Sequence, residues 1–297
     1  MIHLLGKYQN GNYVVKLFEN GTKIRETKEN EFLPQFAENI DLKITNRCTG
    51  TNCPFCHEGS GPCGKHSDIL NEKFIYTLKP YQEIAAGGGN VLEHPDLLPF
   101  LHLLKSKNVI TNITVNQKHF EAEQELIKQL VNEKLIYGLG VSLVNPNEEF
   151  IHLIKKYPNA VIHVINGLLT KENMESLSDN DLKMLILGYK TIRRGELYLK
   201  QEMGTIHRQK QWLYQNLEHY FERFNTISFD KLAIEQLDVK RFLSEEEWNQ
   251  FYMGDDASFT YYIDAVERKF AKSSTAPFQE RFDLENDVVE MFQKIKN

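Results

Sequence analysis

From residue 40 onward, strand-like and helix-like segments alternate, and this order constrains the fold more than any other feature of the chain. Apolar residues between the strands recur at helical spacing, as Leu97, Leu101 and Leu104 do. Such alternation predicts parallel strands joined by right-handed crossovers. The expected strands are Ile40 to Thr45, Glu83 to Ala86, Ile110 to Val115, Tyr137 to Val144, Ala160 to Ile165 and Met184 to Tyr189.

Six such units suit an open barrel better than a closed eight-stranded one. We therefore expect an α/β fold, a partial (β/α)6 TIM-like barrel, with its functional site at the carboxyl ends of the strands. The last strand is mostly continuous in apolar character, which predicts burial on both faces. A further helix is expected from Glu72 to Leu78, after the first strand.

The two ends of the chain depart from this pattern. Asn20-Gly21 separates alternating runs and predicts an N-terminal β-hairpin. A C-terminal α+β extension is expected from a strand-like piece at Ser258 to Ala265 and a helix at Leu284 to Ile295. Another strand-like piece, Ile227 to Ile234, would close the barrel or cap its mouth. The predicted domains are a hairpin extension at 1-38, the partial barrel at 39-235 and an extension packing on the barrel at 236-297.

Composition excludes several classes of protein. Forty-one acidic residues against 35 basic ones give a formal net charge of -6, which disfavours stable nucleic-acid binding through phosphate neutralisation. No apolar run approaches the roughly 18 residues needed to cross a bilayer, and the start of the chain has no long apolar segment. We expect a cytoplasmic protein without a membrane partner.

All four cysteines fall between Cys48 and Cys63, which is too few for a disulfide scaffold and too clustered for chance. Cys48, Cys53 and Cys56 follow the first strand as C-x4-C-x2-C. Two thiolates two residues apart can converge on one metal centre, and a third on a glycine-containing loop can reach it. Their place at the carboxyl end of a strand indicates chemistry rather than a separate structural lobe.

This arrangement resembles the radical S-adenosylmethionine (radical SAM) superfamily over residues 40 to 189. Three features carry the resemblance: the cysteine triplet with Phe55 before its last member, the run Gly87-Gly88-Gly89-Asn90 after the second strand, and the repeated β/α order. The family usually spaces its cysteines C-x3-C-x2-C, and the additional residue here lies next to Gly50. The block from Tyr262 to Thr275 is similar to uncharacterised members encoded by bacterial viruses.

The resemblance implies that the three cysteines hold a 4Fe-4S cluster and leave one iron free for S-adenosylmethionine. Cleavage of that molecule would give a 5'-deoxyadenosyl radical that abstracts hydrogen from a substrate. The residues implied for S-adenosylmethionine are Phe55 near the adenine, Gly87, Gly88, Gly89 and Asn90 near the methionine amino group, and Asn116, Ser142 and Asn166 near the ribose and carboxylate. Because no cysteine lies beyond Cys63, one cluster per chain is expected, reduced by a flavodoxin or ferredoxin.

Other interpretations remain open. The cysteines could instead form a structural zinc site, with His57 or Cys63 as the fourth ligand, in a non-catalytic binding protein. If they are not ligands, we interpret Cys63 as a free thiol in the loop and His57 as a solvated loop histidine. The pair Arg193-Arg194 meets either an anionic substrate or solvent. The substrate, expected to be a nucleotide, a small metabolite or a peptide, is not specified by the sequence.

Overall fold

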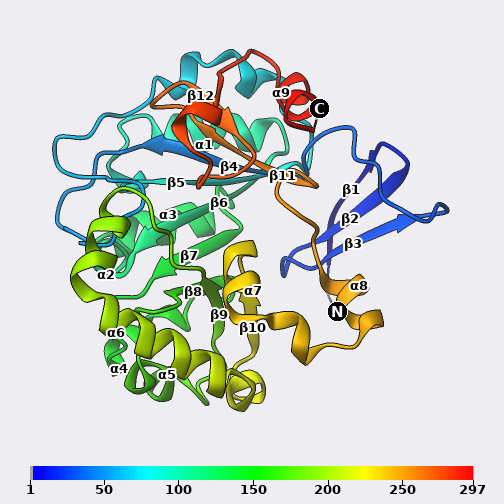
Figure 1. The fold of residues 1–297 in the computed structure, drawn as a ribbon. Helices are drawn as coiled ribbons and strands as arrows, with labels where there is room; N and C mark the ends of the chain where they lie inside the picture. Colours follow the sequence, from blue (N-terminus) through cyan, green and yellow to red (C-terminus); the bar gives the residue numbers. More distant parts are fainter. Residues whose placement is uncertain (1–2, 297) are drawn as a thin grey trace.

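The structure is a computed structural model that describes residues 3–296. Its centre is a ten-stranded sheet with the order β10-β9-β8-β7-β6-β5-β4-β11-β12-β13 (Figure 1). Neighbouring strands from β10 through β11 are parallel, and β12 and β13 continue the sheet antiparallel. The strands are β4 (Asn39–Thr45), β5 (Glu83–Gly88), β6 (Ile110–Asn116), β7 (Gly138–Ser142), β8 (Ala160–Ile165), β9 (Lys183–Leu187), β10 (Thr226–Phe229), β11 (Thr260–Asp264), β12 (Lys269–Ala271) and β13 (Phe282–Asp283).

The mixed α/β fold with a large parallel sheet is confirmed, and the six predicted strands correspond to β4 through β9. Two further parallel strands, β10 and β11, extend the sheet on either side. The segment Ile227 to Ile234 only begins as a strand, because the Asp230 side chain accepts a hydrogen bond from the Ala233 N–H and starts helix α7 there. The C-terminal residues do more than pack on the sheet, since β11 pairs with β4 inside it.

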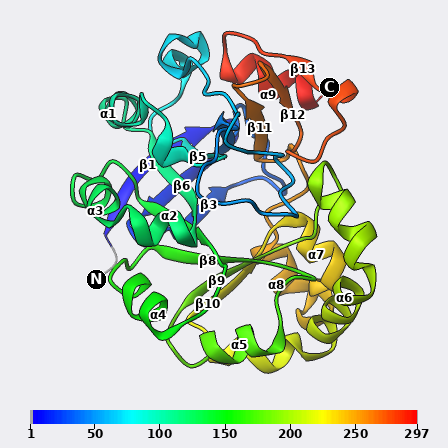
Figure 2. The same cartoon turned by 90° about the vertical axis from the view of Figure 1, so that its left-hand side faces the viewer.

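Helices lie around the outside of these strands (Figure 2). They are α1 (Leu97–Ser106), α2 (Gln117–Ala122), α3 (Gln124–Asn132), α4 (Glu148–Ile154), α5 (Lys171–Leu177), α6 (Arg194–Asn216), α7 (Lys231–Leu237), α8 (Glu245–Phe251) and α9 (Val288–Lys296). The helix expected from Glu72 to Leu78 is wrong, because that segment forms short 3-10 turns, η1 (Ile69–Asn71) and η2 (Lys73–Thr77). Among the described helices, none is both long and apolar enough to span a bilayer.

Strands β6, β8 and β9 bury one of their two faces more fully than the other. In β8 and β9, Ile162, Val164, Met184 and Ile186 are buried, while Leu185 and Leu187 between them are half-buried. The prediction that the last strand is buried on both faces is therefore wrong. Helices cover the outer face of these three strands, and their opposite face stays partly accessible, as is Asp41 of β4.

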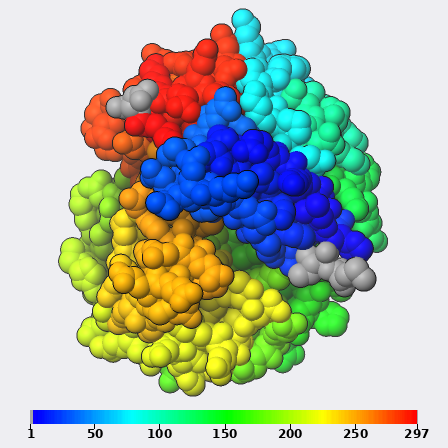
Figure 3. Space-filling view, turned by 90° about the vertical axis from the view of Figure 1, so that its right-hand side faces the viewer, coloured from blue at the N-terminus to red at the C-terminus, as the bar shows by residue number. Residues whose placement is uncertain are grey.

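The N-terminal residues form a separate antiparallel sheet of β1 (Leu4–Asn10), β2 (Tyr13–Phe18) and β3 (Lys23–Thr27). The predicted hairpin is confirmed as β2 and β3, and β1 adds a third strand that was not predicted. From the side shown in Figure 3, this sheet, in dark blue, borders the orange surface of the C-terminal region. There the Arg25 guanidinium stacks 4.1 Å from the centre of the Phe259 ring.

The strand predicted at Ser258 to Ala265 forms as β11, although the alternation of Phe259, Tyr261 and Ile263 is typical of a half-buried strand. Four of its five residues are buried, because β11 lies between β4 and β12 inside the sheet. The predicted terminal helix forms as α9, with Val288, Met291, Phe292 and Ile295 on its buried face. The C-terminal region therefore completes the core beside β4.

Candidate functional site: a cysteine loop at the carboxyl ends of the strands

The cysteine loop, residues 46–68, leaves the carboxyl end of β4 and folds back onto it. The Asn46 N–H donates to the Lys65 carbonyl oxygen at 3.0 Å, and the Ser67 N–H donates to the Ile44 carbonyl oxygen at 2.9 Å. Between these anchors, the Cys48 N–H donates to the Gly61 carbonyl oxygen at 2.9 Å. The loop is thus a hairpin-like excursion whose ends are fixed by backbone hydrogen bonds to the strand.

Three of the four cysteines lie near enough to one another in this loop for their charges to interact. Cys48, Cys53 and Cys56 are half-buried, whereas Cys63 is exposed. The Cys56 N–H donates to the Cys53 carbonyl oxygen at 3.2 Å, which makes the tight turn expected for the C-x2-C pair. Within residues 3–296, no three His, Cys, Asp or Glu side chains are grouped closely enough to hold a single metal ion.

The surroundings of the thiols act on their protonation in opposite directions. Burial raises the pKa of Cys48 and of Cys53, and the neighbouring thiols raise the pKa of Cys53 further. The Thr51 hydroxyl, 3.0 Å from the Cys48 sulfur, and the positive charge of Arg194 lower both values. Burial outweighs these two groups, so the pKa of both thiols stays above its ordinary value, and Thr51 and Arg194 only partly offset the rise.

Arg194 is the basic residue that holds the loop in place. Its Nη1 donates to Asn52 Oδ1 at 3.2 Å and its Nη2 to the Ser60 carbonyl oxygen at 2.6 Å, while its buried Nε has no partner among the described residues. Arg193 donates to the Glu58 carbonyl oxygen. Both arginines bind the cysteine loop, which the sequence analysis did not foresee. Their position just after β9, at the same edge as the loop, was the available signal.

Asn116 connects the end of β6 to the cysteines. Its Nδ2 lies 3.8 Å from the Cys53 sulfur, and its Oδ1 accepts from the Lys118 N–H at the start of α2. The same side chain therefore starts a helix and donates a hydrogen bond toward a thiol. Ser142, half-buried at the end of β7, pairs in register with Asn116.

The glycine run packs against the beginning of the cysteine loop. A Cβ on Gly88, whose φ is +113°, would collide with the Thr45 carbonyl oxygen, and one on Gly89 would collide with the Arg47 carbonyl oxygen. Gly87 faces open space instead. The identity of Gly88 and Gly89 is thus explained by backbone packing, and Gly87 is the member of the run that leaves room for a ligand.

The Asn90 side chain forms hydrogen bonds to other groups of the protein. It accepts from the Leu92 N–H and donates to Glu93 Oε1 at 2.9 Å. The same Glu93 oxygen accepts from the Thr49 hydroxyl at 2.7 Å, next to Cys48. Asn90 and Glu93 thereby join the glycine run to the cysteine loop.

The remaining predicted residues lie at the same edge of the sheet. Asn166, fully buried after β8, donates from Nδ2 to Gln236 Oε1 at 3.1 Å, and its Oδ1 has no partner within residues 3–296. Phe55 packs edge-to-face on Tyr198 of α6, with ring centres 5.9 Å apart. The ligand roles predicted for these residues stay predictions.

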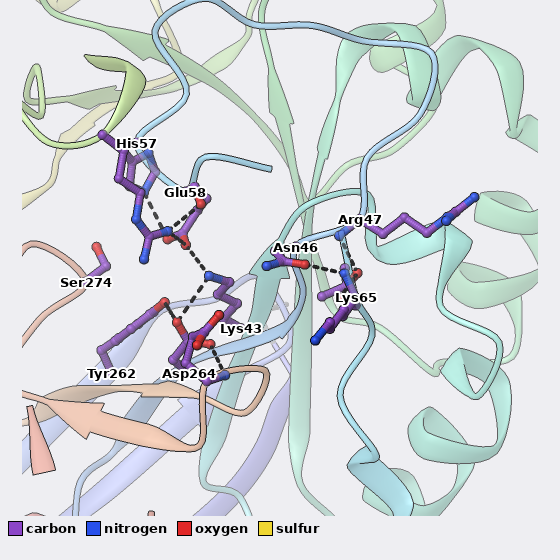
Figure 4. Close-up of polar contacts among 12 residues, drawn as sticks. Lys43, Asn46, Arg47, His57, Glu58, Lys65, Tyr262, Asp264 and Ser274 are labelled. Atoms are coloured by element: carbon purple, nitrogen blue, oxygen red, sulfur yellow. Dashed lines mark hydrogen bonds and ion pairs between the residues drawn. The ribbon is translucent and has the colours of Figure 1, made fainter. Parts of the chain in front are cut away.

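A buried charge network lies under the loop (Figure 4). Lys43 Nζ is 3.0 Å from Glu58 Oε2 and 3.1 Å from Asp264 Oδ2. His57 Nε2 is 3.2 Å from Glu58 Oε1 and 3.4 Å from Lys190 Nζ, so His57 is part of this network rather than a free surface side chain. Burial and the nearby Lys190 charge lower the pKa of His57. The network joins the loop to β4 and β11.

No family model and no curated protein matches this sequence. Solved structures of SuiB from Streptococcus suis share its fold. SuiB bound to precursor peptide SuiA aligns with a TM-score of 0.58 and 13% identity over 88% of this chain and 65% of that chain. SuiB bound to S-adenosylmethionine aligns with a TM-score of 0.56 and 13% identity over 84% and 64%. A third SuiB structure aligns with a TM-score of 0.56 and 12% identity over 90% and 81%. The chain thus spans less than two thirds of the first two SuiB chains, and at this identity the likeness shows the fold.

Proposed function

We propose that this chain is a radical SAM enzyme that holds one 4Fe-4S cluster on Cys48, Cys53 and Cys56. The observation that carries the proposal is the group of three half-buried, neighbouring thiols at the carboxyl ends of parallel strands, with the fourth cysteine exposed. The fold shared with a SuiB structure bound to S-adenosylmethionine supports it. We also propose that the open parallel sheet is the partial barrel of this superfamily and that the three predicted domains are its units.

The residues present fit such a cluster. Thiolates are the ligands of 4Fe-4S clusters, and a cluster takes each thiolate on a different iron, so its ligands spread wider than those of one zinc ion. Three thiolates around a cluster make an anionic group, and the Arg194 charge already acts on two of the sulfurs. Asn116 donates toward Cys53, as groups that tune cluster potentials do.

S-adenosylmethionine would occupy the accessible side of the thiols. Gly87, with open space beside it, lets a ligand approach the backbone, and the unpaired Asn166 Oδ1 is a buried acceptor without a partner in the described chain. When bound, the reduced cluster supplies the electron that cleaves S-adenosylmethionine, and the cleavage supplies the species that removes hydrogen from the substrate. The protein positions these groups and limits the access of water.

The substrate and the electron donor belong to the proposal too. We propose a flavodoxin or ferredoxin as the reductant, in a cytoplasmic setting. The substrate is a nucleotide, a small metabolite or a peptide, and the SuiB structure bound to a precursor peptide keeps the peptide among the candidates.

Anaerobic reconstitution tests the proposal. Iron and sulfide should give about four irons per chain and a brown protein with broad absorbance near roughly 400 nm. Reduction in the presence of S-adenosylmethionine should then release 5'-deoxyadenosine. A colourless protein that binds zinc and cleaves no S-adenosylmethionine would instead establish the zinc-stabilised binding protein.

A further inference from the structure

On the accessible face of the sheet, β7 carries glycine at two successive positions, Gly138 and Gly140, and we call the area above them the glycine strip. Side chains from the neighbouring strands lean into the space. A Cβ on Gly138 would lie 2.6 Å from Asn112 Oδ1. A Cβ on Gly140 would lie 2.6 Å from His163 Nε2 and 2.9 Å from Thr114 Oγ1. Polar atoms from β6 and β8 therefore converge over a strand that has no side chains there.

These three polar side chains have no hydrogen-bond partner in the described part of the chain. Within residues 3–296 no hydrogen bond joins the Asn112, Thr114 or His163 side chain to another group, and each of the three residues is half-buried. None of their polar atoms is among the buried atoms without a partner, so water can occupy these positions until a ligand replaces it. Their free donors and acceptors face the open side of the sheet, where a ligand can reach them.

The glycine strip carries no charge. Burial lowers the pKa of His163 to about 4, so its imidazole is neutral near pH 7 and offers one donor and one acceptor. The other side chains on this face of β6, β7 and β8 are uncharged, at positions 112, 114, 116, 138, 140, 142, 161, 163 and 165. A charged ligand would lose its hydration here and gain no counter-ion from these strands. An uncharged polar group would instead replace its hydrogen bonds to water with hydrogen bonds to the protein.

The glycine strip lies below the cysteine loop, beside the residues of β6 that lead to it. Asn112, Thr114 and Asn116 alternate on one face of β6, and Asn116 approaches Cys53. With a strand rise of about 3.3 Å per residue, Thr114 lies about 7 Å and Asn112 about 13 Å farther from the loop than Asn116. A group bound over β7 would be close to the proposed reaction site without touching the thiols.

We infer that Asn112, Thr114 and His163 bind the uncharged part of the substrate, a group that presents a carbonyl oxygen beside an N–H. Each of these side chains both donates and accepts hydrogen bonds, which matches the paired acceptor and donor of an amide. Such a group occurs as a carboxamide in peptides and as a lactam in pyrimidine bases. The inference rests on the proposed function only in calling the bound group a substrate. Its binding to these three side chains requires no cluster.

NMR of the full chain labelled at histidine 13Cε1 tests the inference, with the His163 signal assigned by its loss in His163→Gln. The probes are acetamide, uracil, acetate and methylammonium. We expect acetamide or uracil to shift the His163 signal in a saturable manner and the two ions to leave it unchanged. Stronger binding of uracil would assign a nucleobase, and stronger binding of acetamide a peptide carboxamide.

Thr114→Val should weaken the binding of the effective probe about fivefold, as expected for one lost hydrogen bond. Thr226→Val, at the exposed first residue of β10, should not change it. The inference is overturned if the neutral probes leave His163 unshifted, if acetate or methylammonium binds as well as they do, or if both threonine variants bind alike. Iron content is measured separately on the same preparations. Loss of the cluster with retained probe binding would contradict the proposed function alone.

Discussion

Lys43 and Asp264 face each other in register on neighbouring parallel strands, with Lys43 Nζ 3.1 Å from Asp264 Oδ2. Lys43 is 2% exposed and Asp264 is fully buried. Glu58, two residues after Cys56, is the second carboxylate on the same ammonium group. One buried cation thus joins the cysteine loop, the first strand of the parallel sheet and the C-terminal strand that pairs with it.

Removing the Lys43 ammonium group should lower the stability of the fold. Lys43→Met leaves Glu58 and Asp264 buried without it, and we expect the free energy of unfolding to fall by about 3–5 kcal/mol. Lys200, which pairs with Glu196 on the exposed surface of α6, is the matched control, and Lys200→Met should change stability by less than about 0.5 kcal/mol. Urea unfolding followed by circular dichroism measures both. Similar losses in the two variants would show that the buried network does not stabilise the fold.

The attachment of the N-terminal sheet should depend on pH through Glu38. This buried carboxylate accepts from Arg25 Nε at 2.7 Å and from Tyr13 Oη at 2.7 Å. Burial raises the pKa of Glu38, but the hydrogen bond from Arg25 and the charges of Lys23 and Arg25 outweigh it, so the pKa lies below its ordinary value of 4.5. Ionised Glu38 therefore stabilises the folded protein above that pH, and the contribution is lost as the pH falls below it.

Glu38→Gln should consequently be less stable than the parent near neutral pH, and the difference should shrink as the pH falls below 4.5. Hydrogen exchange of β2 and β3 amides at a series of pH values locates the effect. Glu26→Gln, at the exposed pair with Lys16, serves as the control and should show little of it. A constant difference between Glu38→Gln and the parent across that range would contradict the assignment.

Local patterns in the sequence were sufficient to predict the strands that follow one another along the chain. Hydrophobic periodicity located β4 through β9 and most of the helices between them, because each is a regular, locally encoded element. The pairing of β11 with β4 was not predictable in this way. It joins residues about 220 positions apart, and it depends on tertiary contacts such as the Lys43–Asp264 pair rather than on periodicity.

In the candidate site, too, local features could be predicted from the sequence and contacts between distant residues could not. The C-x4-C-x2-C spacing is local, and it singled out the three cysteines that are half-buried and not the exposed Cys63. Their role as ligands stays a prediction. The roles of Arg194 and Glu93 at the loop were missed, because both act across the fold on residues remote in sequence. Lys43 carried a signal that was not used: a lysine in the apolar strand IDLKIT can be buried only with a counter-charge.

The glycine run offers a matched set of variants that separate packing from ligand binding. Gly88→Ala places a side chain at φ +113° and against the Thr45 carbonyl oxygen, so we expect a loss of unfolding free energy of about 1–3 kcal/mol or more. Gly87→Ala meets open space, and it should leave stability nearly unchanged while weakening the binding of S-adenosylmethionine. Thermal unfolding and equilibrium dialysis measure the two properties. Equal stability of both variants would refute the packing explanation.

The ligand set is tested most directly by comparing two cysteines of one loop. Cys53 is half-buried, lies next to Cys48 and Cys56, and receives the hydrogen bond from Asn116, whereas Cys63 is exposed. Cys53→Ala removes one of three thiolates, and we expect it to abolish cluster binding. Cys63→Ala should retain about four irons per chain and the absorbance near roughly 400 nm after reconstitution. Equal loss of iron in both variants would contradict the proposed ligand set, in which Cys63 takes no part.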